Sequence, residues 1–162
     1  MATANKSPAL RRASPAPKDA IALLKADHGA VDQLFGEYEK TRSARNKKAL
    51  VAEICAALTV HAQIEEDIFY PAVKKALKDK LLVPEATVEH ATVKELIAQL
   101  EGAEPDGEMY DARVRVLAEY VKHHVKEEQN EMFPKARASS LDLVALGARM
   151  AAHKDELLSV TA

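Results

Sequence analysis

A short motif occurs twice in this 162-residue chain and restricts its possible folds more than any other feature. In each copy a glutamate lies four residues after a histidine. An aromatic residue lies nine residues after the same histidine, and a proline comes directly after the aromatic residue. The copies are His61, Glu65, Tyr70 and Pro71, and His124, Glu128, Phe133 and Pro134. Residues four apart share one face of an α-helix, so each copy predicts a helix with an imidazole and a carboxylate side by side.

Each copy also has a second histidine upstream, and an acidic residue comes directly before that histidine. These pairs are Asp27-His28 and Glu89-His90, which precede the motif histidines by 33 and 34 residues. At about 1.5 Å per residue, two antiparallel helices joined near the middle of such an interval bring their histidines to nearly the same height. The sequence therefore predicts two helical hairpins with the same pattern, related by a pseudo-two-fold axis.

Hydrophobic residues recur at helical spacing from residue 19 onward. The expected helices are Asp19–Lys40, a second from Asn46, a third from Pro84 to Leu100, a fourth from Glu108 to Ala136, and a last from Leu141 to Val160. We expect Ser43 to cap the second helix, and the chain to leave the straight helix axis at or after Pro71. Short loops between these helices predict an all-α fold: an antiparallel up-down-up-down four-helix bundle with a short C-terminal fifth helix.

The same pattern divides the chain into a tail at 1–18, the bundle at 19–137 and a helical extension at 138–162. The tail has four basic residues and no acidic one, and its alanine, proline and serine content predicts disorder. The rest of the chain has a net charge of −6, so we expect no nucleic-acid binding by the folded domain. No apolar run has the length of a membrane span, which favours a cytoplasmic protein without membrane contact. The single cysteine, Cys55, excludes a disulfide framework and is expected to be a small buried hydrophobic residue.

Six histidines and glutamates fall on the helix faces that should point into the bundle. They are His28, His61, Glu65, His90, His124 and Glu128. Burial of such a group without a partner costs roughly several kcal/mol, so six of them need a common partner. We predict two metal ions, one held by His28 and His61, the other by His90 and His124, with both glutamates bridging.

Imidazole and carboxylate ligands together favour iron, with manganese or zinc as less specific alternatives. Two histidines and two bridging carboxylates leave each ion short of six ligands. Small ligands such as O₂, NO, H₂O₂ or water could take the open positions. The sequence does not indicate a protein partner. No phosphate-binding glycine loop, nucleophile-elbow serine or zinc-protease His-Glu-x-x-His motif competes with this interpretation.

These residues resemble the hemerythrin-like HHE cation-binding family, in its small stand-alone bacterial form. The resemblance covers about residues 19–137 and rests on the six histidines and glutamates and on the two aromatic-proline pairs. It implies a four-helix bundle with a non-haem, carboxylate-bridged di-iron centre. The chain departs from the oxygen carriers of the family at Lys94, where they have a fifth histidine, and at Gln129, where they have an aspartate. Both departures argue against tight, reversible oxygen carriage.

Three functions are compatible with such a centre. The first is the binding or sensing of a small oxidant or gas. The second is an enzyme, either a catalase-like protein that disproportionates peroxide or one that reduces NO. The third is iron storage or buffering without turnover. Without the fifth histidine, both ions have more accessible coordination positions. This slightly favours the enzyme over the other two functions.

Other residues near the motifs allow either a role at the centre or an ordinary one. Surface or supporting positions are expected for Asp32, Glu66, Lys94, His123, Glu127 and His153. Tyr38 and Tyr70 could donate a hydrogen bond to bound oxygen or ligate iron, but packing in the core is the expected role. Phe35, seven residues after His28, is expected to wall the ligand pocket.

Overall fold

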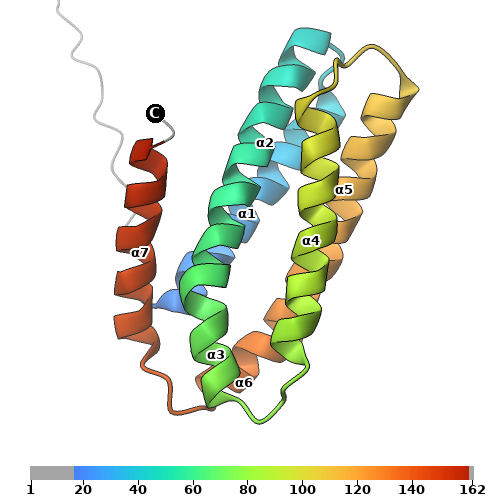
Figure 1. The fold of residues 1–162 in the computed structure, drawn as a ribbon. Helices are drawn as coiled ribbons and strands as arrows, with labels where there is room; N and C mark the ends of the chain where they lie inside the picture. The colour runs from blue at the N-terminus through green and yellow to red at the C-terminus, as the bar shows by residue number, and fades with distance from the viewer. Residues whose placement is uncertain (1–16, 161–162) are drawn as a thin grey trace, which may run out of the picture.

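The computed structural model describes residues 17–160, which are helical apart from short connections. Two helical hairpins form the body of the molecule, and a further helix lies beside them (Figure 1). The elements are α1 (Ala20–Lys40), α2 (Ala44–Ile64), the π-helical turn η1 (Glu65–Phe69), α3 (Tyr70–Ala76), α4 (Leu82–Glu101), α5 (Glu108–Glu127), the π-helical turn η2 (Glu128–Met132), α6 (Phe133–Arg137) and α7 (Leu143–Val160). This is the predicted all-α bundle with a C-terminal fifth helix.

The helix starts follow from side-chain caps. The carboxylate of Asp19 accepts a hydrogen bond from the backbone N–H of Ala22 at 2.9 Å, so α1 begins one residue after its cap. The predicted cap at Ser43 is confirmed, since its hydroxyl accepts from the N–H of Asn46 at 3.3 Å. None of the helices within residues 17–160 has the length and hydrophobicity needed to cross a membrane.

A wide helical turn precedes the motif proline in each hairpin. In η1 the N–H of Tyr70 donates to the carbonyl of Glu65, five residues back, and in η2 the N–H of Phe133 donates to Glu128. A proline has no N–H for the carbonyl four residues before it, so the same turn is loosened in both hairpins.

The chain was predicted to leave the straight helix axis at or after Pro71; the hydrogen bonding already becomes π-helical at Glu65, and α3 runs through the proline and ends at Ala76. A π-helical turn accommodates one extra residue, so the inward face moves on by one position. Phe69 is therefore fully buried, where an unbroken α-helix would turn Ile68 inward. The helix predicted from Glu108 to Ala136 is divided in the same way into α5, η2 and α6.

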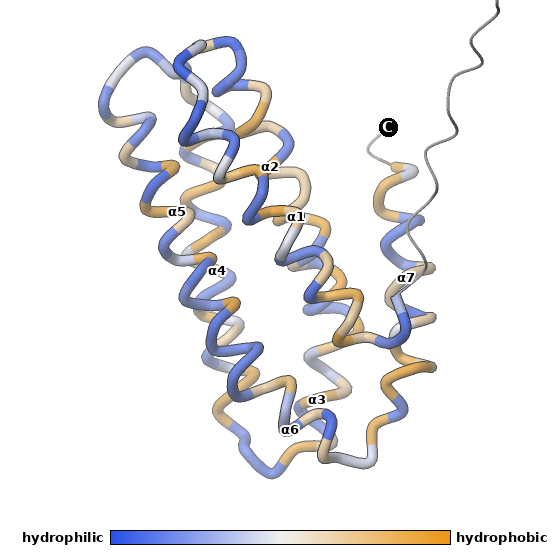
Figure 2. The backbone as a smooth tube through the Cα atoms, turned by 180° about the vertical axis from the view of Figure 1, so that it is seen from behind, coloured by the Kyte–Doolittle hydropathy of each residue, from blue (hydrophilic) through white to orange (hydrophobic). Residues whose placement is uncertain are grey.

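The buried apolar side chains form two clusters, one toward each end of the bundle, and the motif histidines lie between them. Along α1, Leu24 belongs to one cluster and Val31 to the other, with His28 between the two. Figure 2 shows hydrophobic positions recurring along the length of the long helices. The fold thus places a polar layer inside an otherwise apolar core.

The C-terminal helix α7 packs against α1, α2 and η1, beside the end of the bundle that holds α3 and α6 (Figures 1 and 2). Gly147 permits this close approach, because a Cβ there would lie 2.6 Å from the backbone nitrogen of Ala20. Lys154 on α7 reaches Asp27 on α1, with Nζ 2.5 Å from Oδ1. α7 therefore covers the first hairpin.

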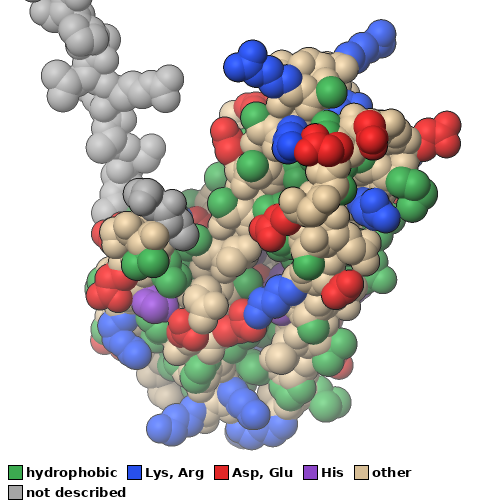
Figure 3. Space-filling view, turned by 45° about the horizontal axis from the view of Figure 1, so that its top comes forward, with side chains coloured by type: hydrophobic (Ala, Val, Ile, Leu, Met, Phe, Trp, Pro, Cys, Tyr) green, Lys and Arg blue, Asp and Glu red, His purple; other side chains and the backbone are tan. Residues whose placement is uncertain are grey.

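The disordered tail expected at 1–18 lies outside the described residues except for its last two positions. Charged side chains of both signs cover the outer faces of the helices on the side shown in Figure 3. Cys55 is 2% exposed in the core, as predicted.

Candidate metal centre

The six predicted site residues come together at one level of the bundle. His28 comes from α1, His61 from α2, His90 from α4 and His124 from α5, while Glu65 and Glu128 open the two π-helical turns. Every one of the six is at most 8% exposed. Such a buried set of titratable groups is unusual in an apolar core and calls for mutual partners.

The Nε2 atoms of the four rings point inward, and each glutamate reaches rings from both hairpins. Glu65 Oε1 lies 3.1 Å from His61 Nε2 and 3.3 Å from His90 Nε2. Glu128 contacts the other two rings, one with each of its oxygens: Oε1 lies 3.2 Å from His28 Nε2 and Oε2 lies 3.5 Å from His124 Nε2. Each carboxylate therefore links the two histidine pairs, as two bridging ligands would.

The donor set fits a pair of cations. Among the described residues, the buried polar atoms without a hydrogen-bond partner include Nε2 of His28 and His61, both oxygens of Glu65, and Oε1 of Glu128. The potential ligand atoms of His28, His61 and Glu128 lie within 4.8 Å of one another, and so do those of Glu65, His90 and His124. These two groups contain the histidine pairs predicted from the sequence, and imidazole and carboxylate donors suit a borderline divalent ion.

A carboxylate behind the centre orients one histidine in each hairpin. Asp27 Oδ2 lies 2.9 Å from Nδ1 of His61, and Glu89 Oε1 lies 3.0 Å from Nδ1 of His124. Such outer partners fix the ring so that Nε2 faces the metal. No role was predicted from the sequence for the acidic residue before each upstream histidine. Its recurrence in both hairpins was the signal that could have revealed this function.

The residue that follows each glutamate of the centre contacts one of the other two histidine rings. The side-chain amide of Gln129 lies 3.2 Å from Nδ1 of His28, and Glu66 Oε2 lies 3.7 Å from Nδ1 of His90. Lys94 in turn pairs with Glu66 at 2.6 Å. Lys94, expected on a solvated edge, is thus linked to the centre through Glu66.

Tyr70 breaks the symmetry of the centre. Its hydroxyl donates to Glu128 Oε2 at 2.6 Å and lies 3.2 Å from Nε2 of both His90 and His124. The corresponding residue of the second hairpin, Phe133, has no hydroxyl and stacks near His28 at a centroid distance of 6.0 Å. Tyr70 is packed in the apolar core, as expected, and its hydroxyl in addition contacts the residues of the centre.

Carboxylates hold two of the histidines strongly basic. Burial by itself lowers the pKa of His61, but the charge of Glu65 and the bond to Asp27 raise it to about 10. In His124, contacts with Glu128 and Glu89 outweigh burial and raise the pKa to about 11. Burial likewise opposes ionisation of Glu128, yet its hydrogen-bonding neighbours hold its pKa well below the usual range. A cation that enters the centre must displace the protons on these rings.

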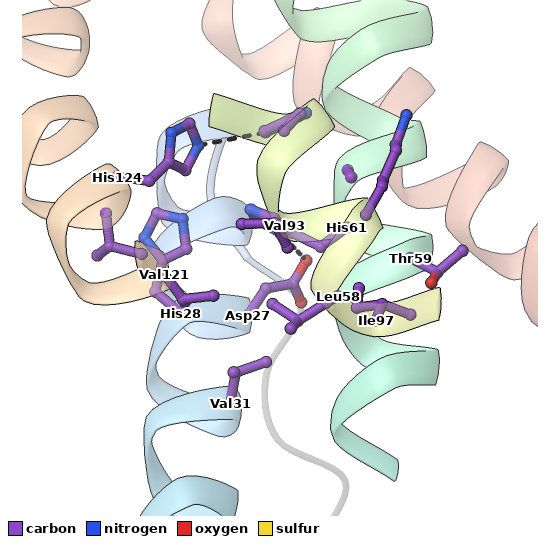
Figure 4. Close-up of a pocket in the computed structure, with 14 residues that line it drawn as sticks. Asp27, His28, Val31, Leu58, Thr59, His61, Val93, Ile97, Val121 and His124 are labelled. Atoms are coloured by element: carbon purple, nitrogen blue, oxygen red, sulfur yellow. Dashed lines mark hydrogen bonds and ion pairs between the residues drawn. The ribbon is translucent and has the colours of Figure 1, made fainter. Parts of the chain in front are cut away.

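A cavity of about 40 Å³ opens beside the histidines. Figure 4 shows Val31, Leu58 and Ile97 below His28 and His61, where they form apolar walls. Lys94 also lines this cavity. Its size and its apolar walls suit a molecule with two or three non-hydrogen atoms. The prediction that Phe35 walls this pocket was wrong, since it lines a different surface hollow together with Tyr38.

The remaining candidates lie away from the six-residue centre. The hydroxyl of Tyr38 donates a hydrogen bond to Asp111 at 2.6 Å. Tyr38 belongs to the apolar cluster that also contains Val31. His153 pairs with Asp67 at 2.8 Å on the outer side of η1, as expected for a surface position. His123 and Glu127 lie on the outer face of α5, and Asp32 is exposed on α1.

Comparison with known proteins gives one family and a few relatives. The family model "Hemerythrin HHE cation binding domain" matches residues 19–136. A protein of Nostoc sp. named "DNA nickase" is 29% identical over 115 residues, which cover 71% of this chain but 32% of that protein. This chain therefore spans about a third of the length of that relative. An uncharacterized protein of Mycobacterium tuberculosis is 25% identical over 143 residues, covering 86% of this chain and 87% of that one.

A solved structure shares the fold of the described chain. It is the crystal structure of a hemerythrin HHE cation-binding domain protein from Mycobacterium kansasii, described as a homolog of the same M. tuberculosis protein. The TM-score is 0.74 at 25% sequence identity, and the match covers 86% of each chain. The likeness therefore extends over most of both chains.

Proposed function

The chain belongs to the hemerythrin HHE cation-binding family, and on that premise we propose that its centre holds two iron ions which bind or react with a small oxidant or gas. The ligands we propose are the four histidines and two glutamates of the centre, and the small molecule is O₂, NO or H₂O₂. Iron storage without turnover is the alternative that the experiment below separates from this function.

The crossed glutamates carry this proposal. Glu65 lies 3.1 Å and 3.3 Å from histidines of different hairpins, and Glu128 lies 3.2 Å and 3.5 Å from the other two. Because each carboxylate lies beside one histidine of each pair, it can bridge two ions and hold them close together. A single ion would leave half of these buried donors without a partner.

The protein's own residues bind, orient and shield the centre. Asp27 and Glu89 fix two of the rings through their Nδ1 atoms. The apolar walls of the adjacent cavity exclude bulk water while admitting a small molecule, and the Tyr70 hydroxyl holds a proton beside Glu128. Iron bound there would supply electrons by cycling between oxidation states.

A second candidate function is peroxide disproportionation, in which two H₂O₂ yield two H₂O and one O₂. The observation that favours it is the hydroxyl of Tyr70, which lies within hydrogen-bonding distance of Glu128, His90 and His124. A proton held at this position can be given to an oxygen leaving as water and returned from the second peroxide. Pure storage has no need of such a donor.

The test uses the full chain produced in iron-replete medium. We expect two irons per chain, and an optical band that changes when O₂, NO or peroxide is added. A band that forms with the gas and reverses on its removal supports binding, whereas rapid loss of peroxide with evolution of O₂ supports the enzyme. Two irons with no response to any of the three molecules would leave storage and overturn the proposed reactivity.

A further inference from the structure

The outer face of α5 carries a third histidine-glutamate pair at the same spacing. His123 and Glu127 are four residues apart and stand one position before His124 and Glu128. In the first hairpin the corresponding residues are Val60 and Ile64, both buried. The second hairpin has thus replaced two core residues with a pair of potential metal ligands.

This pair converges with a carboxylate from α4. His123 Nε2 lies 3.1 Å from Glu127 Oε1 and 3.6 Å from Glu89 Oε2, and the three ligand atoms fit within 4.8 Å. The other oxygen of Glu89 lies 3.0 Å from Nδ1 of His124 in the centre. Ligands of a tetrahedral ion at about 2.0–2.1 Å are separated by a little over 3 Å, which matches this spacing.

His153 shows what an ordinary ion pair of a surface histidine looks like here. Its Nε2 faces Asp67 at 2.8 Å while its Nδ1 faces Glu156 at 3.6 Å. The two carboxylates therefore lie at different edges of the ring and cannot share one ion with it. His123 instead directs a single nitrogen toward both of its carboxylates, which is the arrangement that metal ligation requires.

The first hairpin also shows why this site occurs once. There the outer carboxylate, Asp27, has its second oxygen occupied by Lys154 from α7. The counterpart oxygen of Glu89 faces His123, whose side chain is 63% exposed. The second oxygen of Glu89 is therefore available to an ion from solvent, whereas that of Asp27 is held by Lys154.

We propose that Glu89, His123 and Glu127 form a third cation site, which takes one divalent transition-metal ion such as Zn²⁺ with water completing its coordination. One imidazole and two carboxylates are ligands that zinc accepts in proteins. The ion shares Glu89 with the histidine-rich centre, so it lies one carboxylate away from His124. The site is independent of whether the centre itself holds iron and of what that iron does.

The experiment counts the Zn²⁺ bound by the untagged full chain at equilibrium dialysis, with free Zn²⁺ buffered at a fixed micromolar concentration. The test variant is His123→Gln combined with Glu127→Gln, and the matched control is His153→Gln combined with Glu156→Gln. We expect the test variant to bind one equivalent less than the unmodified chain, and the control to bind the same number. Both variants change surface residues, so their melting temperatures in chelator should match that of the parent.

The difference between the chains decides the proposal, whatever the centre holds. Equal Zn²⁺ binding by the parent and the test variant would show an ion pair only and overturn the third site. Loss of the same equivalent in the control would also overturn it, because the effect would then come from general surface charge. Iron in the six-residue centre is counted separately: its absence would contradict the proposed function, while the difference in Zn²⁺ binding between the chains would still test the third site.

Discussion

The two hairpins are nearly identical where they face each other and different where they face outward. Both have the histidine-glutamate pair, the π-helical turn and the carboxylate behind one ring. On the outside, α7 covers the first hairpin and places Lys154 on Asp27, while the second hairpin exposes His123 beside Glu89. The inner residues of both hairpins contribute to the same centre, so their geometry must match. The outer residues share no such site and can differ.

One difference reaches the interior. Tyr70 places a hydroxyl against His90, His124 and Glu128, and its counterpart Phe133 places only a ring near His28. The two histidine pairs therefore have different surroundings despite matching histidines and glutamates. The comparison teaches that the repeat builds the metal-binding frame, and that single-residue differences on it make the two positions chemically distinct.

The largest expected effect comes from removing either of the two glutamates that contact both histidine pairs. Glu65→Ala or Glu128→Ala should each lose most of the iron from both positions, because each glutamate contacts one histidine of each pair. Iron is counted after a brief chelator wash that removes surface ions. His123→Ala is the control and should keep the iron of the centre. Loss of only one iron in a glutamate variant would break the symmetry of the frame, and equal loss in the control would contradict the assigned ligands.

The next effect tests the covering of the first hairpin by α7. In Gly147→Ala the new methyl would lie 2.6 Å from the nitrogen of Ala20 and 2.7 Å from the carbonyl carbon of Asp19, both backbone atoms. The helix must shift, and we expect the free energy of unfolding to fall by about 1–3 kcal/mol in thermal or urea unfolding.

The matched control for this substitution is Gly36→Ala, a glycine inside α1 with open space around the position of a Cβ. It should raise the stability by up to about 1 kcal/mol, because alanine favours the helix. Unchanged stability in Gly147→Ala would mean that α7 is not docked as closely as described.

A smaller effect tests the internal difference between the hairpins. Tyr70→Phe makes the two halves alike, and we expect it to keep both irons while altering the optical band and the reaction with peroxide. Stability should fall by about 1 kcal/mol, because Glu128 loses a hydrogen bond. Tyr38→Phe removes a similar bond to Asp111 and serves as the control, with an unchanged band. An identical band in both variants would remove Tyr70 from the account.

The smallest effect concerns the charge on Asp27. Lys154→Met removes the ammonium group that lies 2.5 Å from Oδ1 of Asp27. Asp27 then keeps its contact with Nδ1 of His61 but has lost its own cationic partner. We expect iron to be released a few-fold faster, which corresponds to about 0.5–1 kcal/mol. Lys135→Met removes the ion pair between Lys135 on α6 and Asp79 in the connection between α3 and α4, and it should leave the release rate unchanged. The release is followed with a coloured iron chelator, and equal rates in Lys154→Met and the parent would contradict the link.

Much of the fold could be predicted from the sequence because local rules determine it. Helical spacing of apolar residues gave the long helices, and Ser43 was recognised as a cap. The six centre residues could be chosen because their spacing repeats and because buried histidines and glutamates need a common partner. Their convergence at one level followed from helix rise alone.

The rest depended on a local change of helix register and on contacts between distant segments. The π-helical turns alter the helix register by one residue, which brings Phe69 inward in place of Ile68. The position of Tyr70 follows from that register and from the neighbouring hairpin. The contact between Lys154 and Asp27 joins residues 127 positions apart, so no local pattern could indicate it.

The central claim is that two irons share the crossed glutamates of one buried centre. Mössbauer spectroscopy of the full chain, grown on ⁵⁷Fe and washed with chelator, tests it most directly when combined with an iron count. The account predicts two irons per chain with the spectrum of a magnetically coupled pair. Isolated high-spin iron, a single iron per chain, or no iron at all would contradict it.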